Sequence, residues 1–256
     1  MCLLLCAHKS HPGYPLIIAA NRDEFHARPA SEAQYWNDEP SILAGKDLQA
    51  GGTWLGITKY GRIAAVTNYH EHTLNPLPPQ SRGALVSDFL RSEAPPQEYA
   101  EHLIRNGRDY QGFTLVFGTV ETLFYYSNRS NEYGQIKPGI HGLSNHLFND
   151  NSWKVSKGGA FLKDLLSRPD SISPEDLFTL LSDRTRAPRN ALSGHGYETE
   201  KEGLYSSIFI SGKEFGTRCS TAIIIDNGGN VRFSERTFSP EGLVGKTVEY
   251  EFSLLK

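Results

Sequence analysis

The second residue of the chain is a cysteine, and its position suggests a chemistry. Cys2 directly follows Met1 and opens an apolar run that ends at Ala7. If Met1 is removed, Cys2 carries a thiol and a free α-amine, so one residue supplies both a nucleophile and a general base. A free α-amine has a pKa of about 7.7–8.0, which leaves roughly 10–20% of it neutral at pH 7. Spacing alone favours the alternative, in which Cys2 and Cys6 are small buried core residues.

A run of polar residues stands where a buried strand should end. Asn21-Arg22-Asp23-Glu24 directly follows the apolar residues 16–20. Buried charges must be paired or hydrogen-bonded. Arg22 offers a planar fork for a carboxylate, and Asp23 offers an acceptor for an ammonium or a thiol. The alternative is a solvated turn with an Arg22–Asp23 ion pair.

Three further motifs are weaker on their own. Asn68 ends a predicted strand, where its amide could donate to an oxyanion, an interaction worth roughly 3–4 kcal/mol. The glycines of Gly51-Gly52-Thr53-Trp54-Leu55-Gly56 permit close approach to a ligand or to another chain segment, or form a bulge. His70-Glu71-His72 offers two metal ligands without a third, so we expect an exposed loop and no metal.

Short strands and pairs of helices must position these residues. Alternating or apolar runs predict strands at 2–8, 16–21, 41–44, 53–58, 62–68, 113–118, 123–127, 206–211, 219–226, 231–237 and 246–252, with a hairpin at Tyr60-Gly61. Apolar stripes predict helices at 83–91, 97–106 and 153–167, and a capping box at Ser173 starts another that runs to about 183. Residues 184–204 are expected to form a surface loop. Strand blocks that alternate with helix pairs favour an α+β fold of mainly antiparallel sheets.

Composition narrows the class of protein. The 256 residues are 38% hydrophobic and carry a net charge of −3, with no basic run that would indicate nucleic-acid binding. Three cysteines suit a reducing compartment, so we expect a cytoplasmic protein. No apolar stretch is long enough for a membrane-spanning helix. We find no internal repeat and no linker, and we expect one domain over residues 1–256; the oligomeric state is left open.

The ordered set of motifs resembles the NRDE family, also called the transport and Golgi organisation 2 family. The resemblance covers nearly the whole chain, and each motif is short while their order is specific. The motifs are Met1-Cys2, Asn21-Arg22-Asp23-Glu24, Gly51-Gly52-Thr53-Trp54-Leu55-Gly56, Thr67-Asn68-Tyr69, Leu143-Ser144-Asn145 and Thr217-Arg218-Cys219-Ser220-Thr221.

That family is in turn similar to N-terminal-nucleophile (Ntn) hydrolases of the choloylglycine hydrolase and penicillin V acylase type, which implies a four-layer αββα sandwich. The hydrolases separate an active-site Arg from an Asp, whereas here the two residues are adjacent, so Asp23 and Glu24 both remain candidates for the carboxylate. The resemblance implies a catalytic set with Cys2 as nucleophile, Arg22 and Asp23 beside it, Asn68 in the oxyanion hole, and Asn145 and Arg218 as further site residues.

The resemblance implies more than one function. The first is attack of Cys2 on a small linear acyl-amide. The second is a non-catalytic carrier of haem, lipid or acyl-CoA, and the third is a trafficking factor for Golgi organisation. No Cys-Pro or CxxCH haem motif occurs and no cofactor is expected, so haem would be a cargo. The histidines available as its ligands are His8, His26, His70, His72 and His146.

Overall fold

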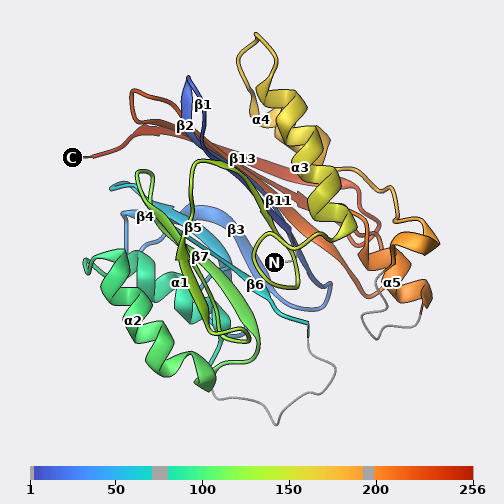
Figure 1. Cartoon of the computed structure of the whole chain (residues 1–256), viewed down its shortest axis with the longest axis horizontal. Helices are drawn as coiled ribbons and strands as arrows, with labels where there is room; N and C mark the ends of the chain where they lie inside the picture. Colours follow the sequence, from blue (N-terminus) through green and yellow to red (C-terminus); the bar gives the residue numbers. More distant parts are fainter. Residues whose placement is uncertain (1–2, 71–79, 193–198, 256) are drawn as a thin grey trace. The chain divides into compact units, whose positions relative to one another are not determined.

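Two antiparallel sheets carry most of the chain. The computed structural model describes residues 3–70, 80–192 and 199–255 (Figure 1). One sheet has the order β10-β1-β2-β11-β12-β13 and the other the order β3-β4-β5-β6-β7-β8-β9. The chain forms two compact units, each discontinuous in sequence. The first comprises Met1–Ala27, Pro138–Ser144 and Asn149–Glu251, and the second comprises the remaining segments, Arg28–Lys137, Asn145–Phe148 and Phe252–Lys256.

The first unit holds the six-stranded sheet and a layer of helices. Its strands are β1 (Leu3–His11), β2 (Tyr14–Phe25), β10 (Gly139–Leu143), β11 (Phe215–Ile225), β12 (Asn230–Phe238) and most of β13 (Val244–Ser253). Helices α3 (Trp153–Leu166) and α4 (Pro174–Leu181) contact β1, β2, β10 and β11, and Figure 1 shows them running along this sheet. Their apolar sides and alternate strand residues form one core, which includes Leu5, Ile17, Leu162 and Leu177.

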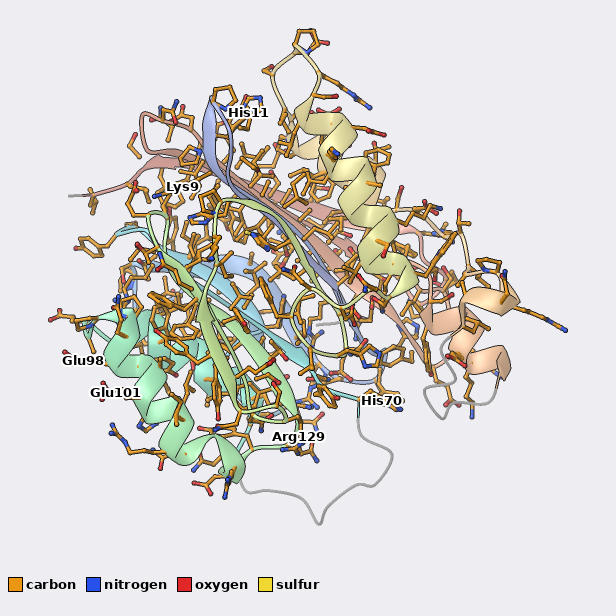
Figure 2. The ribbon with its side chains drawn as sticks, in the orientation of Figure 1. Lys9, His11, His70, Glu98, Glu101 and Arg129 are labelled. Carbon is orange, nitrogen blue, oxygen red and sulfur yellow. The ribbon has the colours of Figure 1, made fainter. Side chains whose placement is uncertain are left out.

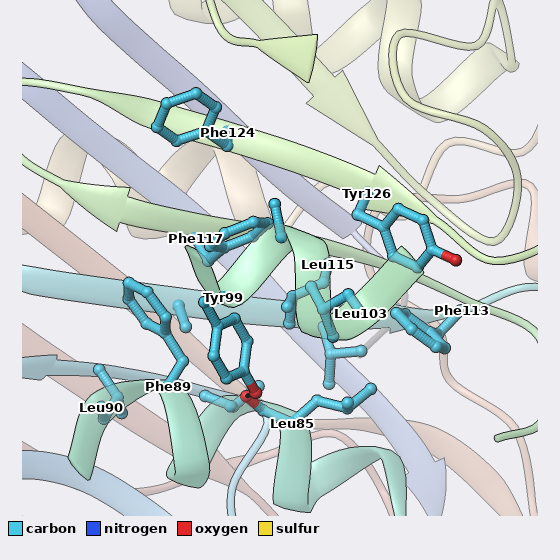
Figure 3. Close-up of a cluster of buried hydrophobic side chains, with 14 of the residues drawn as sticks. Leu85, Phe89, Leu90, Tyr99, Leu103, Phe113, Leu115, Phe117, Phe124 and Tyr126 are labelled. Atoms are coloured by element: carbon cyan, nitrogen blue, oxygen red, sulfur yellow. Dashed lines mark hydrogen bonds between the residues drawn. The ribbon is translucent and has the colours of Figure 1, made fainter. Parts of the chain in front are cut away.

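The second unit repeats this design with the seven-stranded sheet. Its strands are β3 (Ala30–Tyr35), β4 (Ile42–Asp47), β5 (Leu55–Thr58), β6 (Arg62–Asn68), β7 (Phe113–Thr119), β8 (Leu123–Ser127) and β9 (Glu132–Gln135). Helices α1 (Arg82–Arg91) and α2 (Pro96–Asn106) pack on it through an aromatic cluster that includes Phe89, Tyr99 and Phe117 (Figure 3). On α2, Glu98 and Glu101 are exposed on the opposite side, as expected of an amphipathic helix (Figure 2).

These two sheets and two helix layers confirm the predicted α+β fold class. The strand at 62–68 and the strand at 123–127 have the predicted bounds. The Ser173 hydroxyl accepts a hydrogen bond from the Asp176 N–H, and the Ser173 N–H donates to the Asp176 carboxylate. The predicted capping box is therefore present. The prediction of one domain over residues 1–256 stays a prediction.

Two sequence predictions are wrong. The strand predicted at 206–211 is an irregular buried segment, which contributes only an isolated bridge between Ser211 and Gly216. Residues 184–204 are not simply a loop, because they include a short 3₁₀ helix, Arg189–Ala191, and most of α5 (Thr199–Tyr205). The strands β3, β9 and β10 were not predicted either. Each lies at an edge of its sheet, and their short sequences show no clear alternation of apolar and polar residues.

The glycine motif before β5 brings two chain segments together. Gly52 has a φ of 71°, and a Cβ there would lie 2.5 Å from the backbone of Gly83, near the start of α1. The Thr53 N–H donates to the Gly83 carbonyl over 3.2 Å. The close approach that the sequence indicates is therefore to another chain segment.

Candidate active site

The run Asn21-Arg22-Asp23-Glu24 lies within β2 and is mostly buried. Arg22 and Asp23 have exposed fractions of 4% and 1%, so the alternative of a solvated turn is wrong. On one side β2 pairs with β1, where Leu3 is opposite Asn21. On the other side it pairs with β11. Two charged residues are thus held in the middle of a sheet, close to the first described residue of the chain.

Asp23 faces the helix-covered side of the sheet. Residues two apart on a strand share a face. Asn21 donates its carboxamide to the carbonyls of Leu181 (2.9 Å) and Ile208 (2.8 Å), which places this face against the end of α4. Asp23 Oδ1 accepts a hydrogen bond of 2.6 Å from the Thr217 hydroxyl. Glu24 is half-buried, and its Oε1 accepts from the Phe25 N–H.

Arg22 faces the opposite side of the same sheet. In the ladder it pairs with Cys219 of β11, and the next residue on that face of β11 is Thr221. Thr221 donates to the buried carboxyl group of Glu235 over 3.2 Å. Burial raises the pKa of the Cys219 thiol well above its usual value, and the nearby Glu235 adds to the rise. Arg22 therefore lies among a buried thiol, a hydroxyl and a carboxyl group.

A bulge in β11 aligns these side chains. Thr217 pairs with Asp23 and Cys219 pairs with Arg22, so Arg218 is an extra residue with no partner position on β2. The Arg218 guanidinium donates to the carbonyls of Phe25 (2.9 Å) and His26 (3.1 Å). Burial, together with the positive charge of Arg22, lowers the pKa of Arg218. Two arginines thus lie close to one another near one end of β2.

The two predicted asparagines meet in the second unit. The Asn145 carboxamide donates to the backbone carbonyl of Asn68 over 3.2 Å. The backbone carbonyl of Asn145 accepts from the His70 N–H over 2.8 Å. Asn68 lies at the end of β6, and its side chain is half-buried. Within the described part of the chain, the Asn68 carboxamide makes no hydrogen bond.

The predicted site residues therefore fall into two groups and a remainder. Arg22, Asp23 and Arg218 lie together in the first unit, and Asn68 and Asn145 lie together in the second. Cys2 lies outside the described residues. Sequence reasoning missed Thr217, although it directly precedes Arg218 in the motif that prompted that prediction.

The expectations about metal and haem are not tested by this site. Glu71 and His72 lie outside the described residues, while His70 follows β6 (Figure 2). Among the residues that are described, no group of three or more His, Cys, Asp or Glu side chains is arranged to hold a metal ion. Of the helices in the described ranges, none has the length and apolar character needed to cross a membrane.

Solved structures share this fold, among them two hydrolases. The conjugated bile acid hydrolase from Clostridium perfringens, solved as its C2A mutant, aligns with a TM-score of 0.54 at 9% identity and covers 99% of this chain and 97% of that one. A Caenorhabditis elegans ortholog of N-acylethanolamine-hydrolyzing acid amidase aligns with a TM-score of 0.51 at 11% identity and covers 87% and 92%. These identities show the fold alone, and that fold is the predicted Ntn-hydrolase type.

Sequence comparison identifies the family. The Bos taurus transport and Golgi organization protein 2 homolog is 33% identical over 275 residues, which cover 99% of each chain. The Homo sapiens homolog is 32% identical with the same coverage, and the Drosophila melanogaster protein is 26% identical over 98% of this chain and 99% of its own. The sequence profile of the family matches residues 1–240. The chain belongs to the transport and Golgi organisation 2 family.

Proposed function

We propose that the protein is an N-terminal-cysteine hydrolase that cleaves a small linear acyl-amide. The observation that carries this proposal is the burial of Arg22 and Asp23 beside the start of β1. Leu3 is fully buried and pairs with Asn21, the neighbour of Arg22. Cys2 directly precedes Leu3 in the chain, so the residue opposite the neighbour of Arg22 is the one that follows the proposed nucleophile.

The two charges suit the two reactive groups of an N-terminal cysteine. An unperturbed thiol of pKa about 8.5 is only about 3% thiolate at pH 7, and a nearby guanidinium raises that fraction. A carboxylate can in turn orient an ammonium or an amine. Arg22 and Asp23 leave opposite faces of β2, and the thiol and the amine leave the Cα of Cys2 in different directions. We assign the thiol to Arg22 and the amine to Asp23.

The choice between the two adjacent carboxylates favours Asp23. Asp23 is 1% exposed, and the Thr217 hydroxyl fixes one of its oxygens at 2.6 Å. Glu24 is half-buried, and its carboxylate contacts the N–H of the next residue, Phe25. A fixed, buried carboxylate is better suited to orient an amine than one that accepts from the backbone N–H of the next residue.

The reaction follows from these roles. The amine of Cys2 takes the thiol proton, and the thiolate attacks the amide carbonyl. The resulting oxyanion needs a hydrogen-bond donor, a role that the family resemblance implies for the Asn68 carboxamide. Asn145 in turn donates to the Asn68 backbone carbonyl. The C–N bond then breaks, the amine product leaves with the proton, and a thioester remains on Cys2. Water attacks the thioester, which releases the carboxylic acid and restores the thiol. The step requires that Met1 has been removed.

The comparisons support this assignment through the named activities of the fold relatives. One is described as an acid amidase that hydrolyses N-acylethanolamines, and the other as a conjugated bile acid hydrolase whose mutated residue is a cysteine at position 2. This chain also has a cysteine at position 2. A small acyl-amide substrate and a cytoplasmic location are part of our proposal.

Hydrolysis of a panel of N-acyl amides tests the proposal. The panel should vary the acyl length and the leaving amine, and the products should be measured by mass spectrometry. We expect turnover of at least one member, loss of turnover in Cys2→Ala, and normal turnover in the matched variant Cys6→Ala. Binding of acyl ligands or haem without turnover, or a Cys2→Ala protein that performs as the wild type does, would support a carrier or trafficking role instead.

A further inference from the structure

We propose that Thr217 is a positioning residue that orients the Asp23 carboxylate and holds it in its charged form. This inference rests on the proposed hydrolase function and adds a residue to it. Thr217 and Asp23 are each 1% exposed, and the bond between the Thr217 hydroxyl and Asp23 Oδ1 is 2.6 Å long. The two residues are 194 positions apart in the sequence.

A second hydrogen bond is consistent with this direction. The Ile210 N–H donates to Thr217 Oγ1 over 2.9 Å, so the hydroxyl proton is not needed for that contact. An ionised carboxylate can only accept, and the Thr217 hydroxyl donates its proton to Asp23 Oδ1. A hydrogen bond to the charged form of a carboxyl group favours that form.

The segment that holds Thr217 is itself anchored to the protein. The Thr217 N–H donates to the Ile210 carbonyl over 2.9 Å, so these two residues exchange a pair of bonds. The neighbouring Phe209 N–H donates to the Asp183 carbonyl over 2.8 Å, and the Ile208 carbonyl accepts from Asn21. The Thr217 hydroxyl thus accepts from the backbone of a segment that is itself anchored on the helix-covered side of the sheet.

The bulge at Arg218 places Thr217 on the correct face. In a regular strand Thr217 and Cys219 would share a face, whereas their partners Asp23 and Arg22 are adjacent and face opposite sides. The extra residue removes this conflict, so that Thr217 meets Asp23 while Cys219 meets Arg22. The bulge therefore lets one strand supply a partner to each of two adjacent charged residues.

The test compares three variants of the full-length protein. Thr217→Val keeps the shape of the side chain without the hydroxyl, and Thr217→Ser keeps the hydroxyl. Thr58→Val is the matched control, since Thr58 is also 1% exposed and accepts backbone N–H groups, from Tyr60 and Arg62 at the β5–β6 turn. Each protein is assayed for kcat/KM against pH with an N-acyl amide that the wild type hydrolyses.

We expect Thr217→Val to lower kcat/KM by about 10-fold to 100-fold, the size of one hydrogen bond to a charged group. The acid limb of its pH profile should move to higher pH, because Asp23 then takes up a proton more readily. Thr217→Ser should stay within about 3-fold of the wild type, and Thr58→Val should keep the wild-type pH profile. The role of Thr217 is rejected if Thr217→Val keeps that profile, or if Thr217→Ser falls as far as Thr217→Val.

Two further observations keep the outcomes separate. If the wild type hydrolyses no amide and its Cys2 alkylates no faster than a free cysteine, the hydrolase proposal fails and this inference fails with it. If Thr217→Val does not fold, NMR of the wild-type protein decides. The Thr217 hydroxyl proton should then exchange slowly with water and show a hydrogen-bonded shift, and a fast-exchanging hydroxyl would contradict the inference.

Discussion

Arg22 and Asp23 are adjacent in the sequence, yet their side chains leave opposite faces of β2. Asp23 shares its face with Asn21 and receives a hydrogen bond from Thr217, whereas Arg22 pairs with Cys219 on the other face. Hydrolases of the resembled type separate their Arg and Asp along the sequence. Here adjacency is compatible with separate roles because a strand alternates its side chains. One short motif can therefore supply a cation and a carboxylate to two different groups of the proposed nucleophile.

Removal of the Arg22 charge should slow the reaction of the Cys2 thiol. Without the guanidinium, the thiolate loses a stabilising positive charge and its pKa rises, and a rise of one unit would lower the thiolate fraction at pH 7 about tenfold. We expect Arg22→Gln to reduce the rate of Cys2 alkylation by roughly that factor, as measured by iodoacetamide labelling and mass mapping. The matched variant is Arg232→Gln, which removes a guanidinium from β12 that donates to the Ile172 carbonyl. Equal alkylation rates in the two variants would rule out this role for Arg22.

The two asparagines should differ in what they lose. The Asn68 carboxamide makes no hydrogen bond to the described residues, so Asn68→Ala should leave the free energy of unfolding nearly unchanged. Loss of an oxyanion donor should instead lower kcat by about 10²–10³ with little change in KM. Asn145→Ala removes a 3.2 Å hydrogen bond to the Asn68 carbonyl, so this variant, unlike Asn68→Ala, should lose about 1 kcal/mol of its free energy of unfolding. Urea unfolding and steady-state kinetics check both statements. A stability loss in Asn68→Ala as large as that in Asn145→Ala would contradict them.

The two buried cysteines should stay unreactive in the folded protein. Burial raises the pKa of Cys6 to about 12 and that of Cys219 well above its usual value. At pH 8, alkylation should therefore spare both thiols until a denaturant exposes them, and mass mapping of the native and unfolded protein measures this. Rapid native labelling of Cys6 would show that β1 is not packed as described.

The same burial makes stability depend on pH in the alkaline range. The folded pKa of Cys6, about 12, lies above the ordinary value of 9.0, so the folded state keeps its proton longer than the unfolded state does. The protonated Cys6 thiol therefore makes its full contribution to the free energy of unfolding below pH 9. That contribution is lost as the pH rises from 9 towards 12, at up to about 1.4 kcal/mol per pH unit. Urea unfolding across this range should show that the free energy of unfolding declines more steeply with pH for the wild type than for Cys6→Ala. Parallel declines in the two proteins would contradict this prediction.

Much of the fold could be predicted from local sequence patterns, because interactions between residues close in the sequence determine where many strands and helices begin and end. The β6 bounds follow from an apolar run, and the start of α4 follows from Ser173, Pro174 and Asp176. Edge strands such as β3 have one unpaired side and a mixed sequence, so no alternation indicates them. The apolar residues around Phe209 resemble a strand, but their backbone bonds go to Asp183 and to the Asn21 side chain.

The contacts of the site could be predicted only in part. The residue types at 22, 23, 68, 145 and 218 could be assigned from their motifs. Their geometry depends on the register between β2 and β11. The strand predicted from the sequence begins at Cys219, so it includes neither Thr217 nor the bulge at Arg218. The bond from Thr217 to Asp23 spans 194 residues, and no spacing rule indicates such a partner.

The central claim is that Cys2 is a free N-terminal residue that forms a covalent acyl intermediate. The most direct measurement is reaction of the purified protein with a thiol-selective acylating probe at pH 7, followed by intact-mass analysis and peptide mapping. We predict a single acyl group on Cys2 of a chain that lacks Met1, with Cys6 and Cys219 unmodified. Retention of Met1 in the functional protein, or labelling of Cys6 and Cys219 as rapid as that of Cys2, would contradict the account.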